Sequence, residues 1–162
     1  MELEDSVCAD GVTYCLRTTG NTLSFWVAND LEDKSIQDIV LAFVANGEKL
    51  EKQEIILIEE EFFVKNGIQV VSTKGNTKVD DLIESHKDLV SINIKKLEIV
   101  SNEILKQVKD FSALTDEEIE KYLTIRIFDK EEVKAILLQA IQENRLKEEM
   151  ISDKLRQKLS AK

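Results

Sequence analysis

The chain has 162 residues, of which 43% are hydrophobic and 33% charged, and its formal net charge is −10. This composition is typical of a globular protein rather than a disordered one, and the length suits one domain or two small ones. No window approaches ~18 consecutive apolar residues, which excludes a conventional transmembrane helix. The acidic balance also disfavours nucleic acid and anionic membranes as partners.

The first part of the chain predicts a β-hairpin followed by a helix. Residues 12–17 and 23–28 are rich in β-forming side chains, and the turn-forming residues 18–21 lie between them. Residues 35–38 then have the spacing of a capping box, which predicts a helix start at Ser35. The apolar stripe of this helix ends near Asn46-Gly47 and consists of Ile36, Ile39, Val40, Phe43 and Val44.

A second hairpin is predicted next. Residues 54–58 are strongly β-forming, residues 62–64 extend the same strand, and Asn66-Gly67 is the turn that leads to residues 68–72. Capping-box spacing at 77–80 predicts a short helix through Ser85. Residues 90–94 alternate with period two, which is typical of a fifth strand or of the lead-in to the next helix.

From about Lys95 onward the pattern predicts helices. The first has an apolar face of Leu97, Val100, Ile104, Val108 and Phe111. Residues 115–118 form a third capping box before a short helix, and Asp129 caps the last helical stretch. The apolar register slips by one at Leu146, which indicates one bent helix or two successive helices.

Strands followed by helices predict an α+β fold with a mainly antiparallel sheet, built from two hairpins and a possible fifth strand, with interspersed helices and a helical C-terminal part. Residues 1–112 carry 12 basic and 21 acidic side chains, whereas residues 113–162 carry 10 and 11. We therefore expect an α+β domain over 1–112 and a helical extension over 113–162, or a single domain that contains both.

Residues with catalytic or metal-binding chemistry are few. Cys8 and Cys15 lie too far apart for a CxxC motif, so inert thiols are favoured over a redox-sensitive pair. His86 is the only histidine, and its place at a predicted helix end indicates an exposed side chain rather than a catalytic base. Because phosphate-binding glycine loops and zinc motifs are absent from the sequence, we expect no catalytic residue, no metal site and no cofactor.

Four residues are candidates for binding a partner protein: Glu59, Glu60, Glu61 and Trp26. The carboxylates interrupt an apolar run, where they form a solvated bulge or strand end, contacts for Lys and Arg of a partner, or a cation site with Asp80 or Asp81. Trp26 alternates with Phe25 on a strand, so it is either a core residue or an exposed contact hot spot.

These observations favour a cytoplasmic, non-enzymatic, acidic accessory or inhibitory module that binds a basic partner protein. One alternative is a metal-assisted hydrolase that uses scattered carboxylates and His86. A second is a nucleic-acid accessory protein that docks through the basic C-terminal helix, since residues 145–162 carry a net charge of +3. A homodimer through the apolar face of that helix is a further prediction, which depends on Ile151, Leu155 and Leu159.

Overall fold

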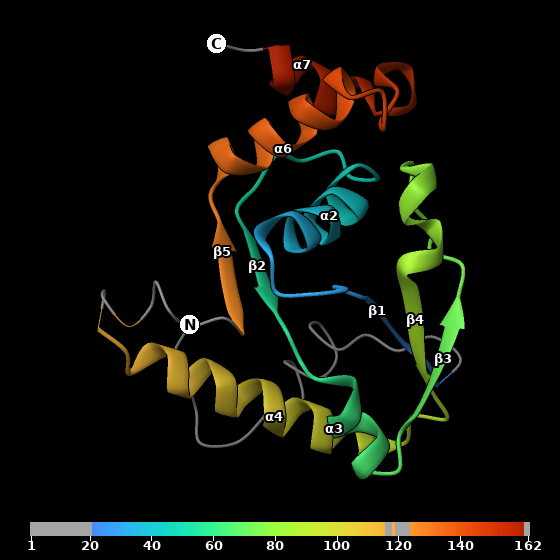
Figure 1. The fold of residues 1–162 in the computed structure, drawn as a ribbon, viewed down its shortest axis with the longest axis vertical. Coiled ribbons are helices and arrows are strands. Elements are labelled where there is room, and N and C mark those ends of the chain that lie inside the picture. Colours follow the sequence, from blue (N-terminus) through green and yellow to red (C-terminus); the bar gives the residue numbers. More distant parts are fainter. Residues whose placement is uncertain (1–20, 116–117, 119–123, 161–162) are drawn as a thin grey trace. The chain divides into compact units, whose positions relative to one another are not determined.

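The computed structural model describes residues 21–115, 118 and 124–160. Within them, helices and antiparallel strands combine in the α+β fold that the sequence predicts (Figure 1). The chain folds as two compact units. Unit 1 contains the described residues of Met1–Phe25, Ile56–Val71 and Lys87–Arg126, and unit 2 contains those of Trp26–Ile55, Ser72–His86 and Ile127–Lys162.

Three predictions have a limited outcome. The strand at 12–17 and the short helix after Thr115 lie outside the described residues. The division between 1–112 and 113–162 stays a prediction.

None of the helices in the described ranges has both the length and the apolar character that a membrane crossing requires.

Five strands lie in the described part of the chain. β1 (Leu23–Trp26), β4 (His86–Val90) and β3 (Gln69–Thr73) pair in that order, and β2 (Gln53–Ile56) pairs with β5 (Ile125–Phe128). The strand predicted over residues 23–28 is thus confirmed at its first four residues. In each of these five strands, the start belongs to one unit and the end to the other.

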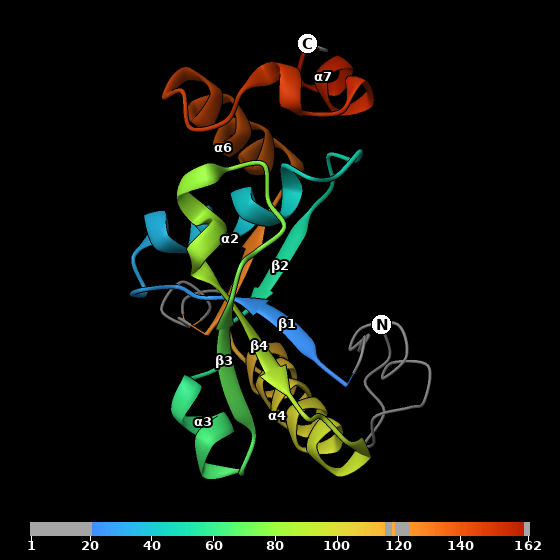
Figure 2. The same ribbon diagram turned by 90° about the vertical axis from the view of Figure 1, so that its right-hand side faces the viewer.

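In unit 1, α3 (Glu60–Lys65) and α4 (Ile94–Ser112) lie beside the strand segments of the same unit (Figure 2). Asn93 begins α4 by accepting a hydrogen bond from the Lys96 amide (2.9 Å), and an N-cap side chain of this kind satisfies an amide that the helix leaves free. The two helices and the strands share one apolar core. Its buried members are Phe63, Ile68, Leu89, Ile92 and Val100.

The Asn-Gly pair at 66–67 ends α3 instead of forming the predicted hairpin turn. Gly67 has φ +67°, its amide donates to the Val64 carbonyl (3.0 Å), and the next amide donates to the Phe63 carbonyl (2.9 Å). This is the Schellman arrangement, which satisfies the last carbonyls of a helix through a residue in the left-handed region. The prediction that residues 62–64 extend the strand is therefore wrong, because the same Asn-Gly signal can end a helix.

Unit 2 is built mostly from helices. They are α2 (Asp33–Val44), the 3₁₀ helices η1 (Asp80–Ser85) and η2 (Glu148–Met150), α6 (Lys130–Gln142) and α7 (Asp153–Ser160). α2 packs against α6 (Figure 1), and α7 contributes to the same apolar core. Fully buried side chains in this core include Val40, Leu41, Val133, Leu137 and Leu155. Each such burial contributes roughly 1.5–3 kcal/mol relative to an exposed side chain.

The predicted capping box at 35–38 does not form, because α2 begins earlier. Its cap is Glu32, whose side chain makes no capping hydrogen bond, while the Asp30 carboxylate accepts from the Glu32 amide (3.0 Å). Ser35 consequently lies inside the first turn. Four residues of the predicted stripe are buried, namely Ile36, Ile39, Val40 and Val44, whereas Phe43 is 63% exposed.

Two further elements are displaced from their predicted places. The short helix is present as η1, but Val79 is its cap and Thr77 accepts only from the Val79 amide (3.3 Å), so the capping box at 77–80 is absent. The fifth strand lies earlier, as β4, which ends at Val90; residues 91–93 lead into α4, which is the other alternative that the sequence left open. Ser91 has φ 54°, which ends the extended backbone before the helix begins.

β5 interrupts the chain that was predicted to be helical from Lys95 onward. Its sequence, Ile-Arg-Ile-Phe, has Ile125 buried and Ile127 44% exposed. The strand is too short for its period-two signal to stand out beside the helical patterns on both sides. Its pairing with β2, distant in sequence, stabilises it.

Asp129 caps α6 as the sequence predicts. Its carboxylate accepts from the amides of Glu131 and Glu132 (both 2.8 Å), and the Glu132 carboxylate accepts from the Asp129 amide (2.7 Å). Both halves of this capping box are local in sequence, so the prediction needs no knowledge of the tertiary structure.

Asn144 ends α6 and explains the register slip at Leu146. It has φ 57°, its amide donates to the Ile141 carbonyl (3.0 Å), and the Arg145 amide donates to the Ala140 carbonyl (2.9 Å). Asparagine therefore takes the left-handed position that glycine takes at the end of α3. The slip is a boundary between successive helices rather than a bend.

The left-handed conformation of Asn144 leads to a prediction for two substitutions. Asn144→Gly should leave the free energy of unfolding within ~0.5 kcal/mol of the parent or raise it, since glycine adopts positive φ without strain. Asn144→Val should lower it by about 1–2 kcal/mol, because a β-branched residue is strained there. Urea unfolding followed by circular dichroism measures both, and equal losses would contradict the proposed role of the backbone conformation.

Candidate functional site

The three predicted carboxylates lie at the start of α3 in unit 1. Glu59 is the N-cap, Glu60 and Glu61 occupy the first turn, and all three residues are exposed. Glu60 pairs with Lys87 (2.5 Å) and Glu61 with Lys65 (3.1 Å). Among the described residues, Glu59 has no ion pair or side-chain hydrogen bond. Its carboxylate is therefore the one most available to a partner.

An exposed apolar side chain accompanies these carboxylates. Val64 is 62% exposed and follows Glu60 by four positions and Glu61 by three. Residues at these spacings are neighbours on one helix face. The start of α3 thus presents an apolar contact with carboxylates beside it. We call Glu59, Glu60, Glu61 and Val64 the α3 patch.

Trp26 is half-buried in unit 2, where it packs against the core. Its ring lies edge-to-face with the His86 ring, with centroids 5.0 Å apart and an interplanar angle of 74°. A Cβ atom at Gly75 would lie 2.7 Å from Trp26 Cζ3, so this position accepts only glycine without rearrangement. Trp26 therefore offers a partner only the part of its ring that the core leaves exposed.

His86 lies at a helix end, as the sequence predicts, but it is half-buried rather than exposed. It is the C-cap of η1 and the first residue of β4, and its side chain lies against neighbouring strands of the sheet. Its Nδ1 atom is hydrogen-bonded to the Thr73 hydroxyl at 2.7 Å. The two contacts, with Thr73 and Trp26, give His86 a packing role.

A small cavity lies beside Trp26, and an acidic loop follows it in the chain. The cavity is lined in part by Trp26 and Asn29. Its volume of about 30 Å³ has room for a water molecule or two but not for a ligand.

The acidic loop that follows Trp26 places exposed Leu31 (45%) between the exposed residues Asp30 and Glu32. Sequence reasoning missed this second group of acids around an apolar residue, although the run is visible in the sequence.

The guanidinium of Arg145 joins three segments of unit 2. Nη1 donates to Asp38 of α2 at 2.8 Å and Nε donates to Asp81 of η1 at 2.8 Å, while Nη2 lies 2.7 Å from the same Asp81 carboxylate. The Arg145 side chain is 22% exposed and that of Asp38 26%. The hydrogen bond that Arg145 donates to Asp38 raises the pKa of Arg145 most, burial opposes this, and the hydrogen bond to Asp81 raises the pKa further. The guanidinium therefore stays cationic at any ordinary pH.

A surface hollow of about 310 Å³ opens beside this ion-pair group. We call it the Arg145 hollow. Its lining includes Lys78, Asp80, Asp81, Arg145, Lys147 and Met150. The sequence gives no signal for it, because its two lining segments are separated by more than sixty positions and only tertiary packing brings them together.

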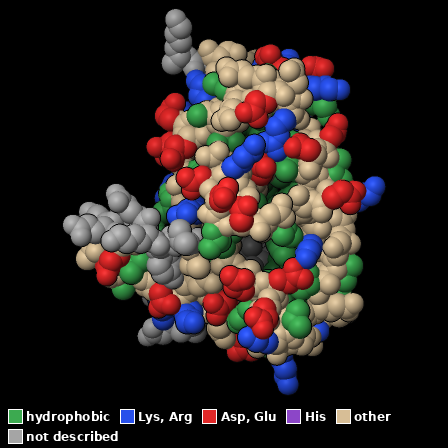
Figure 3. All heavy atoms as spheres, viewed as in Figure 1, with side chains coloured by type: hydrophobic (Ala, Val, Ile, Leu, Met, Phe, Trp, Pro, Cys, Tyr) green, Lys and Arg blue, Asp and Glu red, His purple; other side chains and the backbone are tan. Residues whose placement is uncertain are grey.

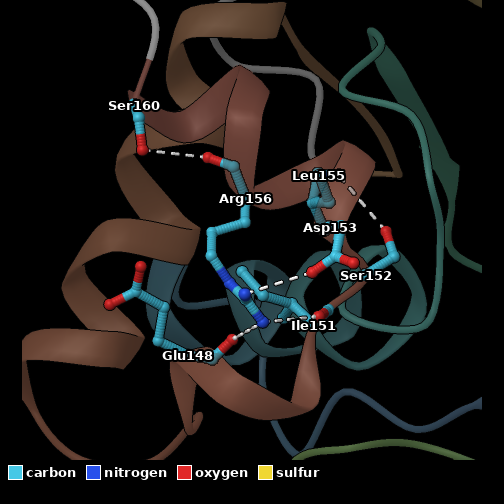
Figure 4. Close-up of polar contacts among 7 residues, drawn as sticks. All are labelled: Glu148, Ile151, Ser152, Asp153, Leu155, Arg156 and Ser160. Atoms are coloured by element: carbon cyan, nitrogen blue, oxygen red, sulfur yellow. Dashed lines mark hydrogen bonds and ion pairs between the residues drawn. The ribbon is translucent and has the colours of Figure 1, made fainter.

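Arg156 stabilises the turn that connects η2 to α7. Its guanidinium pairs with Asp153 (3.1 Å) and donates to the carbonyls of Glu148 (3.2 Å) and Ile151 (3.3 Å), as Figure 4 shows. The Ser152 hydroxyl accepts from the Leu155 amide (3.2 Å) in the first turn of α7. These contacts fix the turn that precedes the last described helix.

The basic residues near the C-terminus are largely engaged by this chain's own groups. Lys154 pairs with Glu48 at 2.6 Å, and Lys158 donates to the Glu48 carbonyl at 3.5 Å. Arg145 and Arg156 are held by the contacts given above. Three of the basic side chains predicted to face nucleic acid, those of Arg145, Lys154 and Arg156, are therefore ion-paired within unit 2.

The apolar face predicted to form a homodimer is buried in the same chain. Ile151 is 3% exposed, Leu155 0% and Leu159 8%, and all three belong to the core of unit 2. A helix that covers its own core has no free face of this kind for a second copy. The reason for that dimer prediction is thereby removed.

Within the residues that the structure describes, no three His, Cys, Asp or Glu side chains gather in a way that could hold a metal ion. Cys8 and Cys15 lie outside those residues. No protein-family model, curated protein or solved structure matches the chain. Its function is therefore argued from the chemistry of its own side chains.

The ion pairs of Arg145 and Lys154 differ in exposure, which leads to a prediction. Arg145→Met should lower the free energy of unfolding by about 1–3 kcal/mol, because it leaves two carboxylates without their partner. Lys154→Met, which removes an exposed pair of 71% and 60% side-chain exposure, should leave the urea midpoint nearly unchanged. Similar midpoints for the two variants would contradict the structural role of Arg145.

Proposed function

We propose that the protein is a non-enzymatic, acidic accessory or inhibitory module that binds a basic partner protein. The observation that carries this proposal is the α3 patch, in which Glu59 has no ion pair among the described residues and exposed Val64 follows Glu60 and Glu61 at helix-neighbour spacing. Acidic side chains (red) lie among lysines and arginines (blue) on the face that Figure 3 displays, so a local group of contacts is favoured over one broad acidic field.

The chemistry of such a contact follows from these side chains. Val64 supplies apolar area that a partner can cover, and the surrounding carboxylates pair with Lys or Arg at the rim. Rim charges mainly accelerate association and make it sensitive to salt. Trp26, with the acidic loop at Asp30–Glu32, is proposed as a second contact point, on unit 2.

The two alternative functions have less support in the described residues. The metal-assisted hydrolase would require carboxylates gathered around an ion, and the described residues contain no group of three His, Cys, Asp or Glu side chains placed to hold one. Nucleic-acid binding would require free cations near the C-terminus, where Lys154 and Arg156 are paired internally. The acidic protein-binding proposal requires neither.

Two charge reversals in unit 1 test the proposal. Immobilised full-length protein should recover a basic protein from lysate of the source cell at low salt and lose it as ionic strength rises. Glu59→Lys should reduce this recovery several-fold, because it places a cation in the α3 patch. Glu98→Lys makes the same charge change at an exposed residue of α4 and should leave recovery unchanged.

Quantitative mass spectrometry of the recovered proteins provides the readout. A partner retained equally by the parent and both variants, or one retained undiminished in high salt, would contradict the proposed contact. Equal losses in both variants would attribute the binding to net charge alone and would remove the assignment to α3.

A further inference from the structure

The Arg145 hollow has the size of a ligand site and an unusual charge for so acidic a chain. Its volume of about 310 Å³ falls at the lower end of the range for small-molecule pockets. Three cationic side chains line it: Lys78, Arg145 and Lys147. Two carboxylates, Asp80 and Asp81, line the hollow as well. Whether each of them is ion-paired determines how much positive charge the hollow presents.

Asp81 is ion-paired with Arg145, which donates to it from Nε and also donates to Asp38 from Nη1. Asp80 has no ion pair or hydrogen bond among the described side chains, and the same holds for the ammonium groups of Lys78 and Lys147. Two unpaired cations thus face one unpaired carboxylate. Counted over the side chains that line the hollow, three cations stand against two carboxylates, an excess of one positive charge in a protein of net charge −10.

Arg145 adds oriented donors to this excess. A guanidinium has five N–H groups; Nε and Nη1 donate to Asp81 and Asp38, and Nη2 lies 2.7 Å from an Asp81 oxygen. The other N–H groups are on a side chain that is already held in place, so little rotamer entropy is lost when they bind an anion. Planar, pre-oriented donors of this kind suit the oxygens of a phosphate group.

Met150 supplies an apolar wall. It is 40% exposed and lines the hollow, and a thioether side chain adapts to the shape of an apolar ligand surface. The hollow therefore combines cations for an anionic head with a contact for a less polar body.

We infer that the Arg145 hollow binds a small phosphate monoester, with its phosphate between Lys78, Lys147 and Arg145 and its organic part against Met150. This site is independent of the proposed partner contact on α3. Free inorganic phosphate shares the anionic chemistry and should bind more weakly, because it makes no contact with Met150.

Methyl-labelled methionine gives a direct test, because the chain has only two methionines. In the full-length protein, phenyl phosphate at up to about 10 mM should shift the Met150 methyl signal saturably; Met150→Leu identifies that signal. Inorganic phosphate should compete at higher concentration, and phenol should cause no saturable shift. A saturable shift with phenol, or none with phenyl phosphate, would overturn the inference.

Three variants assign the binding to named groups. Lys78→Ala combined with Lys147→Ala should weaken phenyl phosphate binding by on the order of tenfold, whereas Lys95→Ala with Lys106→Ala, on exposed positions of α4, should leave it unchanged. Asp80→Asn should tighten binding several-fold by removing the one unpaired carboxylate. Equal weakening in the two double variants, or weaker binding in Asp80→Asn, would contradict the site.

Discussion

The contacts of Arg145 are the constraint that joins three segments of unit 2 far apart in the sequence. Arg145 lies 107 positions from Asp38 and 64 from Asp81, yet its guanidinium is within 2.8 Å of both carboxylates. The left-handed Asn144 directs the chain out of α6 at this point, so a local backbone conformation determines where the long-range ion pairs form. The same contacts hold η1 beside the segment after α6, and the Arg145 hollow follows from that arrangement.

Local chemistry explains which parts of the fold the sequence could predict. The helix cap at Asp129 and a strand over residues 23–28, of which 23–26 form β1, could be predicted because their signals depend on neighbouring residues. Signals with two structural meanings gave errors: Asn-Gly at 66–67 ends a helix here, whereas it also forms hairpin turns. β5 was missed because a short strand stabilised by a distant partner has almost no local signature.

The candidate sites also combine features that the sequence shows with features that only the tertiary structure creates. The acidic run at Glu59–Glu61 was visible in the sequence, but its helical setting and the nearby exposed Val64 were not. The Arg145 hollow was invisible, because its charges come from segments that only the tertiary structure brings together. Conversely, the C-terminal segment has an apolar face and a positive charge in isolation, and both are used within unit 2. An amphipathic helix near the end of a chain is therefore weak evidence for an external partner.

The distances indicate that Arg145 couples energetically to Asp38 of α2. A double-mutant cycle with Arg145→Met and Asp38→Asn, followed by urea unfolding, measures this coupling. We expect an interaction energy of about 1–3 kcal/mol, with the double variant less destabilised than the sum of the two single variants. Effects that add to within ~0.5 kcal/mol would contradict it, because they would show that the two side chains do not depend on each other.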